Sequence, residues 1–247
     1  MKLTGNTILI TGGTSGIGLG FAEKFLELGN KVIICGRRVE RLEQIIKNHP
    51  EMDALVCDVT DAVQRVELCD QVLAHSPKLN LLINNAGIQL MTDLTTPVDI
   101  EEVRSEIETN LTAPIHLASL FAGHLAAMAA EREAAIVNIT SGLAFAPVSP
   151  MPVYCATKAA MHSLTMTLRH QLKTQAIKVF EIAPPAVDTD LGHEYRLDKS
   201  RSHGGIPITE FIDNAIQALE EDRLEAPIGM AADLRDKREK LFDLMNR

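Results

Sequence analysis

The sequence predicts an α/β fold of the doubly wound type, in which helices cover both faces of one mostly parallel sheet. Short apolar runs alternate with longer helical patterns along almost the whole chain. The apolar runs are nearly continuous rather than alternating, as is typical of strands buried on both faces. The expected strands cover residues 6–11, 31–36, 53–58, 79–84, 134–140 and 177–183, and the expected helices cover residues 16–29, 38–48, 61–75, 99–130, 153–175, 209–220 and 231–246.

Composition favours one globular domain that spans residues 1–247. Hydrophobic residues make up 46% of the chain and charged residues 23%, which are ordinary values for a protein with a packed core. We find no linker, low-complexity segment or internal repeat between the elements. The net charge is −9, so the chain as a whole does not attract nucleic acid or an anionic membrane surface. Any anion that the protein binds must therefore be held by a local arrangement of hydrogen-bond donors or positive charges.

The cysteines and histidines show no spacing typical of a metal site, and we expect none. The amino terminus becomes polar and glycine-rich too early for a signal peptide, and no uninterrupted apolar run reaches membrane-spanning length. We therefore expect a cytoplasmic protein without membrane insertion, whose thiols are reduced. The four cysteines are Cys35, Cys57, Cys69 and Cys155.

Ligands of a doubly wound sheet bind outside the carboxyl ends of its strands, so the residues that follow each strand matter most. The first strand runs into the sequence TGGTSGIG, residues 11–18. Glycines allow a tight turn and a close approach to a pyrophosphate, which then lies at the positive end of the next helix. A plain glycine-rich turn before a helix is the alternative for this motif taken alone.

The sequence VYCATK places Tyr154 and Lys158 four residues apart. In a helix, this spacing puts both side chains on one face, close enough to interact. We expect the ammonium to lower the pKa of the tyrosine towards neutrality, so that the phenol can give a proton to a carbonyl oxygen or take one back. The alternative is one more aromatic side chain on an amphipathic helix.

Together these motifs resemble the short-chain dehydrogenase/reductase family, and the resemblance extends over about 180 positions. The family has a TGxxxGIG turn, an NNAG motif after the fourth strand, and a serine about thirteen residues before the Tyr-x3-Lys pair. All of these occur here, with the serine at position 141. The resemblance implies a Rossmann-type fold and a catalytic set of Asn110, Ser141, Tyr154 and Lys158.

The resemblance also implies which residues bind the dinucleotide. Two positions depart from the usual pattern of the family: Ser15 stands where many NADP-binding relatives have a base, and Pro185 replaces a glycine near the nicotinamide. We expect Pro185 to stiffen that wall of the site. The implied set is Gly12, Thr14, Ser15, Gly16, Ile17, Gly18, Arg37, Arg38, Asp58, Val59, Asn85, Ala86, Gly87, Tyr154, Lys158, Pro184, Val187 and Thr189.

The end of the second strand favours NADP over NAD, although NAD remains possible. NAD-binding proteins usually place an acidic residue here for the ribose 2′-hydroxyl, whereas this chain has Gly36 followed by Arg37 and Arg38. Two cations at a helix start are unfavourable unless an anion compensates, and arginine suits a 2′-phosphate. In NADP-preferring relatives the first of these bases binds the phosphate, which implies Arg37. Two solvated surface arginines are the alternative.

Pro114 has no backbone N–H. In a helix through this region, the Asn110 carbonyl therefore lacks the hydrogen-bond donor that residue 114 would normally supply. We hypothesise that this carbonyl holds a water that links Lys158 to solvent. An equally weighted alternative is that Pro114 only occupies the first turn of a new helix.

Residues 190–208 correspond to the substrate lid of the family, which makes His193 and Tyr195 candidates for substrate contact; a plain surface loop is the alternative. The helices over 110–130 and 153–175 are apolar on more than one face, so we expect a homo-oligomer, a dimer formed through them.

The resulting expectation is an NADP(H)-dependent oxidoreductase that interconverts a ketone or aldehyde and an alcohol, with Tyr154 as general acid/base. A catalytically silent NADP-binding sensor or scaffold is the alternative from another class. An epimerase or dehydratase is disfavoured because such relatives carry an extra substrate domain. The chain ending and APPAVDTD (183–190) resemble bacterial DltE-like oxidoreductases linked to D-alanylation of teichoic acids. A bacterial-type 3-hydroxy-acid dehydrogenase is a further alternative, and the sequence does not identify the substrate.

Overall fold

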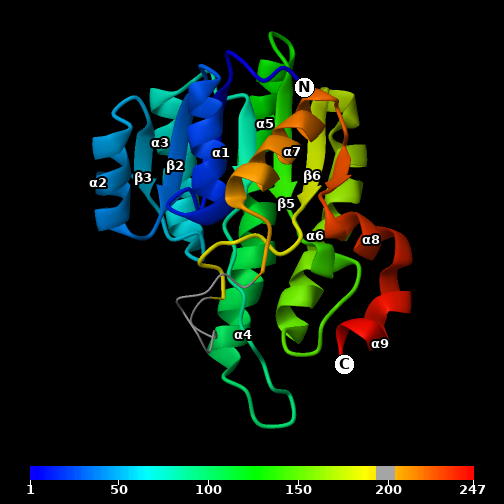
Figure 1. Cartoon of the computed structure of the whole chain (residues 1–247). Coiled ribbons are helices and arrows are strands. Elements are labelled where there is room, and N and C mark those ends of the chain that lie inside the picture. The colour runs from blue at the N-terminus through cyan, green and yellow to red at the C-terminus, as the bar shows by residue number, and fades with distance from the viewer. Residues whose placement is uncertain (193–203) are drawn as a thin grey trace.

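A computed structural model describes residues 1–192 and 204–247 as one α/β domain built on a seven-stranded sheet (Figure 1). Every strand pair is parallel, and the strand order is β3-β2-β1-β4-β5-β6-β7. The predicted fold class is therefore confirmed. The strands are β1 (Thr7–Thr11), β2 (Lys31–Gly36), β3 (Asp53–Val56), β4 (Leu81–Asn84), β5 (Ala134–Ile139), β6 (Ile177–Ala183) and β7 (Glu225–Pro227).

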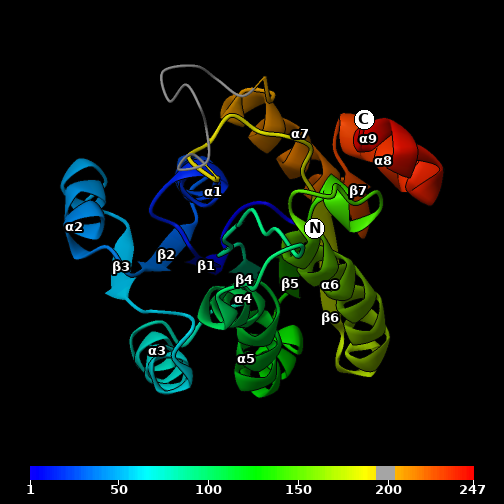
Figure 2. The same cartoon turned by 90° about the horizontal axis from the view of Figure 1, so that it is seen from below.

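Helices cover both faces of the sheet, as Figure 2 shows from below. Helices α1, α2 and α7 pack on one face, where Phe21, Phe25 and Phe211 join the apolar side chains of the strands. Helices α3, α5 and α6 pack on the other face around a second core that includes Phe121. The helices are α1 (Gly16–Glu27), α2 (Val39–Asn48), α3 (Ala62–His75), α4 (Ile100–Ile107), α5 (Ala113–Ala129), α6 (Pro152–Gln171), α7 (Ile208–Glu220), α8 (Met230–Lys237) and α9 (Phe242–Met245).

The strand order reverses between β1 and β4, and this reversal determines where the functional residues gather. From β1, the chain builds outward through β2 and β3, then crosses back to place β4 on the other side of β1. The two halves therefore diverge at the carboxyl ends of β1 and β4, which is where an open α/β sheet binds ligands. The glycine-rich turn and the NNAG motif follow these two strands.

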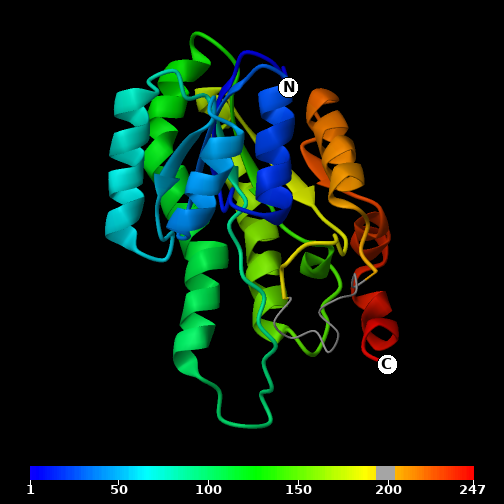
Figure 3. The same ribbon diagram turned by 60° about the vertical axis from the view of Figure 1, so that its left-hand side comes forward.

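The predicted helix over 99–130 is interrupted in its middle. Between α4 and α5, residues Glu108–Thr112 form a π-helical turn, in which the Ala113 N–H reaches back to the Glu108 carbonyl. Pro114 lies in the first turn of α5 and cannot donate a backbone hydrogen bond. In Figure 3, α4 projects below the sheet while α5 continues alongside it. Turns of this kind are frequent at functional sites, and this one carries Asn110.

The helical run Ile100–Ala129 is long and apolar enough to cross a membrane, and it is the one such helix within residues 1–192 and 204–247. Its most apolar 18-residue window has a mean hydropathy of 1.3, and 33% of that window is buried. Core helices of globular proteins meet the same criterion, and α5 buries Leu117, Phe121 and Leu125 against the sheet.

The carboxyl-terminal region differs from the expectation in two ways. Residues Glu225–Pro227 add a seventh strand beside β6, although three residues that include a proline give too weak a pattern to predict. The expected helix over 231–246 breaks after α8 because Arg238 has a φ of +49°. A 3-10 turn, Arg238–Leu241, then leads into α9. All four cysteines are buried and free of disulfides.

Candidate active site

The glycine-rich turn after β1 fits closely against the NNAG segment that follows β4. Gly12 has a φ of +66°, and a Cβ atom there would lie 2.8 Å from the Ala86 Cα. A Cβ atom on Gly18 would lie 2.4 Å from the Asn85 Nδ2, which donates a hydrogen bond to the Thr11 carbonyl at 2.9 Å. Glycine is therefore required at both positions, and the side chain of Asn85 joins the two strand ends.

The turn leads directly into the amino terminus of α1. Ser15 is the N-cap residue in extended conformation, and its side chain makes no capping hydrogen bond. The first backbone N–H groups of α1 therefore remain oriented towards the turn, with the positive end of the helix dipole behind them. Thr189 approaches the same turn, because a Cβ atom on Gly16 would lie 3.3 Å from its side chain. The structure thus brings the predicted residues of β1 and β6 together.

At the end of β2, Arg38 rather than Arg37 reaches the glycine-rich turn. The Arg38 guanidinium donates to the Thr14 Oγ1 at 2.8 Å and to the Ser15 Oγ at 3.0 Å. The Arg37 side chain is 60% exposed and lies 3.7 Å from the Asp58 carboxylate. Burial, and then the charge of the nearby Arg41, lower the pKa of Arg38. Asp190, which pairs with Arg41 at 3.8 Å, opposes this shift, so three arginines meet two carboxylates here and leave an excess of positive charge that suits an anion.

The end of β3 places its predicted residues beside this corner. Asp58 accepts hydrogen bonds from the backbone and hydroxyl of Thr60, which fixes the turn before α3. Val59 is 7% exposed, and its carbonyl accepts from Arg65. These two residues therefore present a defined backbone turn next to Arg37.

Tyr154 and Lys158 lie on one face of α6, as predicted, and both are buried. The Lys158 Nζ lies 5.6 Å from the centre of the Tyr154 ring and donates to the Ile139 carbonyl at 3.0 Å. Ser141, which follows β5, accepts a hydrogen bond from the Leu143 N–H at 3.1 Å. Its hydroxyl also lies near enough to Tyr154 to act on the phenol, whose pKa it tends to lower. Ser141, Tyr154 and Lys158 therefore form one group.

Burial dominates the electrostatics of this group. It raises the pKa of Tyr154 to about 12, against a smaller opposing effect of the Ser141 side chain. It also lowers the pKa of Lys158 to about 8. The expectation that Lys158 draws the pKa of Tyr154 towards neutrality is therefore wrong for this structure. Desolvation penalises the phenolate and the ammonium alike, and it outweighs their mutual attraction.

The Asn110 side chain is connected to the site by hydrogen bonds with the backbone of Ile88 and the hydroxyl of Thr157. Its Oδ1 accepts from the Ile88 N–H at 2.9 Å, and its Nδ2 donates to the Ile88 carbonyl at 2.8 Å and to the Thr157 Oγ1 at 3.2 Å. Gly87 precedes this clamp, and a Cβ atom there would lie 3.6 Å from the Lys158 Nζ. Asn110 thus sets the position of the NNAG segment against α6.

The remaining predicted residues follow β6. The Pro184 carbonyl accepts from the Gly142 N–H at 2.8 Å and ties this strand end to the one that carries Ser141. Val187 is buried and forms an isolated parallel bridge with Ile206. His193 and Tyr195 lie outside the described residues, as does most of the expected lid.

A largely apolar cavity of about 940 Å³ opens beside the segment that carries Ser141 and Tyr154. Leu143, two residues after Ser141, and Cys155, next to Tyr154, line it, and Met91 and Phe242 line other walls. Tyr154 and Lys158 do not line this cavity, so the cavity lies next to these two residues without including them.

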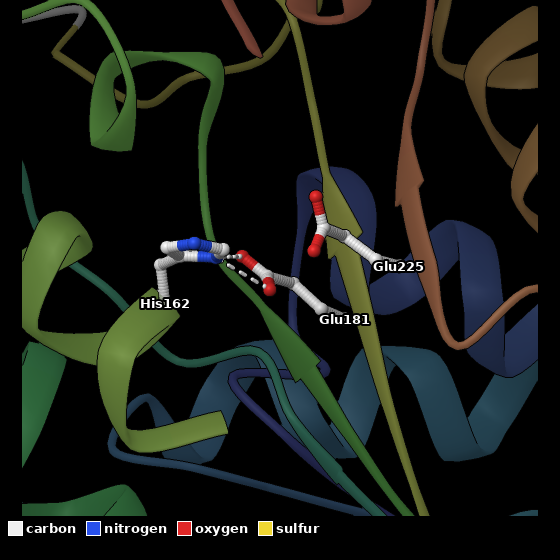
Figure 4. Close-up of side chains that lie close together, drawn as sticks. All are labelled: His162, Glu181 and Glu225. Atoms are coloured by element: carbon white, nitrogen blue, oxygen red, sulfur yellow. Dashed lines mark hydrogen bonds and ion pairs between the residues drawn. The ribbon is translucent and has the colours of Figure 1, made fainter. Parts of the chain in front are cut away.

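A second polar cluster, which the sequence analysis missed, joins α6 to β6 and β7 (Figure 4). The His162 Nδ1 lies 2.8 Å from the Glu181 Oε2, and the Thr140 hydroxyl donates to Glu181 at 2.8 Å. Glu225 pairs with Arg235. The groups of His162, Glu181 and Glu225 lie within 4.8 Å of one another, a spacing that a metal ion could bridge. Because each carboxylate already has a protein partner, we assign the cluster a structural role.

Known proteins resemble this chain in sequence and in fold. The sequence profile described as short chain dehydrogenase matches residues 6–200. The uncharacterized oxidoreductase DltE of Bacillus subtilis is 45% identical over 100% of this chain and 98% of its own. Serine 3-dehydrogenase of Rhizobium radiobacter is 32% identical over 74% of this chain and 73% of its own.

Solved structures of other proteins share the fold of this chain. A short-chain dehydrogenase from Sphingobium yanoikuyae, in complex with NADPH, superposes with a TM-score of 0.81 at 28% identity, covering 92% of this chain and 90% of that one. A short chain dehydrogenase/reductase from Burkholderia phymatum, in complex with NAD, has a TM-score of 0.85 at 23% identity, covering 100% and 97%.

Proposed function

Because this chain belongs to the short-chain dehydrogenase family, we propose that it is an NADP(H)-dependent oxidoreductase that interconverts a ketone or aldehyde and an alcohol. The observation that carries this proposal is the buried group of Ser141, Tyr154 and Lys158, which lies at the carboxyl ends of the strands. A phenol, a hydroxyl and an ammonium are the groups that proton transfer to a carbonyl oxygen requires.

The residues around β1 and β4 fit a dinucleotide. The amino terminus of α1 can receive the pyrophosphate, and the close contacts of Gly12 and Gly18 keep side chains out of the turn. When bound there, the nicotinamide supplies or accepts the hydride. As the family resemblance implies, Thr189, which approaches the turn from β6, would bind the carboxamide, and Lys158 would bind the nicotinamide ribose.

In the reductive direction, the Tyr154 hydroxyl donates its proton to the substrate oxygen. Ser141 donates a hydrogen bond to the same oxygen as negative charge develops on it. The Lys158 ammonium, 5.6 Å from the tyrosine ring, stabilises the phenolate that remains. In the oxidative direction, the phenolate takes the proton from the alcohol. Asn110 holds Ile88 and so keeps the wall of the site in place.

The preference for NADP rests on the cationic corner after β2. Arg38 is fixed by Thr14 and Ser15 beside the turn, and Arg37 and Arg41 add positive charge to the same region. A 2′-phosphate would relieve this repulsion, and guanidinium groups bind phosphate through paired hydrogen bonds. We assign the main contact to Arg38 and a supporting one to Arg37.

Turnover with a panel of ketones and aldehydes tests the proposal directly. We expect the purified protein to oxidise NADPH with at least one carbonyl compound, and Tyr154→Phe to lose 10²–10⁴-fold in kcat while still binding NADPH. Arg132→Ala, on a half-buried residue whose side chain donates to the Gly5 carbonyl, serves as the control. NADPH binding without turnover on any substrate would favour the sensor or scaffold alternative.

We also propose that the protein acts in the cytoplasm as a homodimer built on α5 and α6. Ile115 on α5 and Met166 on α6 are 43% and 51% exposed. Large apolar side chains of this kind on neighbouring helices suit a subunit interface. Met166→Lys should shift the mass measured by light scattering from dimer to monomer.

A further inference from the structure

Glu106 is a carboxylic acid inside the protein, with no place in the catalytic scheme above. It lies on α4, one helical turn before Asn110, and its exposed fraction is 0%. Its Oε1 accepts a hydrogen bond from the Leu90 N–H at 3.0 Å. Its Oε2 is buried and has no hydrogen-bond partner among the described residues. A buried polar atom without a partner is costly, which calls for a compensating interaction.

The backbone contact of Glu106 repeats that of Asn110. Asn110 holds Ile88 through its side-chain amide, and Glu106 holds Leu90, two residues further along the same segment. The two residues are four apart in sequence, so both side chains leave the α4–α5 run on the same side. Together they fix the segment that follows NNAG.

The charged surroundings of Glu106 come from α6, against which α4 packs. Lys158 is the cation that Glu106 acts on electrostatically, and Tyr154 and Cys155 are the other titratable groups that it influences. Burial raises the pKa of Glu106 above its ordinary value, and the Leu90 N–H and the ammonium of Lys158 oppose part of that rise. From the segment after β4, the Leu90 N–H adds a donor.

We propose that Glu106 is a positioning residue of the active site, whose buried carboxylate holds the segment after NNAG and supplies the counter-charge for the Lys158 ammonium. This inference rests on the proposed function, since Lys158 matters only if the Tyr154 group is catalytic. An ammonium within a protein is unfavourable unless a charge opposes it. Lys158 otherwise has only the Ile139 carbonyl as a hydrogen-bond acceptor among the described residues.

The charge of Glu106 affects the pKa values of both Lys158 and Tyr154. Burial lowers the pKa of Lys158, and Glu106 raises it against that trend. Loss of the carboxylate charge should therefore lower the Lys158 pKa further, below about 8. The same loss lowers the Tyr154 pKa, because the carboxylate disfavours the phenolate. Reduction needs the ammonium and the phenol, so both changes move the alkaline limb of its pH profile to lower pH.

Glu106→Gln removes the charge and keeps an oxygen that can accept from Leu90. We expect the alkaline limb of kcat for NADPH-dependent reduction to move down by about one pH unit. Glu106→Asp, which keeps the charge, should restore most of the original profile. Glu102→Gln is the matched control: it removes the same charge from an exposed residue one turn nearer the start of the same helix.

A second readout does not depend on turnover. In protein labelled with ¹³C-lysine, the Lys158 Cε resonance is identified by its loss in Lys158→Met and is titrated by NMR. We expect a midpoint near 8 in the wild type, a lower midpoint in Glu106→Gln, and no change in Glu102→Gln. Equal midpoints in the wild type and Glu106→Gln would overturn the inference. Failure of the wild type to bind NADPH or turn over would instead overturn the proposed function.

Discussion

Tyr154 and Lys158 lie side by side on α6, and burial moves their pKa values in opposite directions, to about 12 and about 8. The phenol therefore keeps its proton across the physiological range, whereas the ammonium begins to lose its proton near pH 8. The pair is set for proton donation, and the lysine is the member that titrates close to working conditions.

This difference predicts the pH dependence of carbonyl reduction. The active form has Tyr154 as a phenol and Lys158 as an ammonium. As pH rises, Lys158 loses its proton first, so kcat should be constant below pH 7 and fall through a midpoint near 8. A profile of kcat between pH 5 and 10 checks this. A rate that stays constant up to pH 10 would contradict the assignment of the ammonium.

The contact between the glycine-rich turn and Asn85 predicts a local stability effect. In Gly18→Ala, the new Cβ atom would lie 2.4 Å from both the Asn85 Nδ2 and the Gly12 carbonyl oxygen. Because the carbonyl is backbone, the turn must shift, and we expect a loss of about 2 kcal/mol in the free energy of unfolding. Denaturant titration measures it.

Gly123→Ala is the matched control for this substitution. Gly123 is an exposed residue of α5, and an added Cβ atom would meet nothing within 4 Å. Because Gly123 shares a face of α5 with Ile115, the comparison is made in the monomeric Met166→Lys background, where alanine should stabilise the protein by about 0.5–1 kcal/mol. Equal effects of the two substitutions would show that the turn is not closely packed.

The His162–Glu181 pair predicts a non-additive effect on stability. His162→Leu leaves the fully buried Glu181 with Thr140 as its remaining close partner, which should cost about 3 kcal/mol. Replacing both residues with leucine removes the unpaired charge, so the double variant should recover most of this loss. Urea titration of the two single variants and the double variant measures the coupling. Additive losses would mean that the two side chains act independently.

Pro114 provides a test of the proton path proposed for Asn110. The structure places Pro114 in the first turn of α5, directly after the π-helical turn, where it cannot donate to the Asn110 carbonyl. If that carbonyl holds a water that resupplies protons to Lys158, Pro114→Ala should lower kcat and change its pH dependence. If both stay at wild-type values, the water path is ruled out.

Much of the fold was predictable because each strand is a continuous apolar run and each strand end carries its own motif. The predicted boundaries of β2 and β6 match the structure, since glycine or proline follows the last apolar residue. The interruption at Glu108–Thr112 was not predictable, because the helical periodicity continues through it. Nor was β7, whose three residues are a strand only because β6 lies beside them.

The candidate site was predictable in composition but not in its contacts or electrostatics. Motif spacing placed Tyr154 and Lys158 on one face, but only the depth of burial reveals that desolvation raises the tyrosine pKa. Sequence alone could not tell which arginine reaches Thr14, because that depends on the rotamer and on the direction of α2. For Glu106 the sequence offers one weak indication. It lies four residues before Asn110, a helical spacing that turns both side chains towards the interior.

The central claim is tested most directly by fluorescence titration of the protein with NADPH and with NADH. We expect NADPH to bind at least tenfold more tightly, and Arg38→Ala to remove most of this difference while Arg37→Ala reduces it less. NADH affinity should change little in either variant, since NADH has no 2′-phosphate. Equal affinity for the two cofactors would contradict the role of the arginines, and no binding of either would contradict the proposed function as a whole.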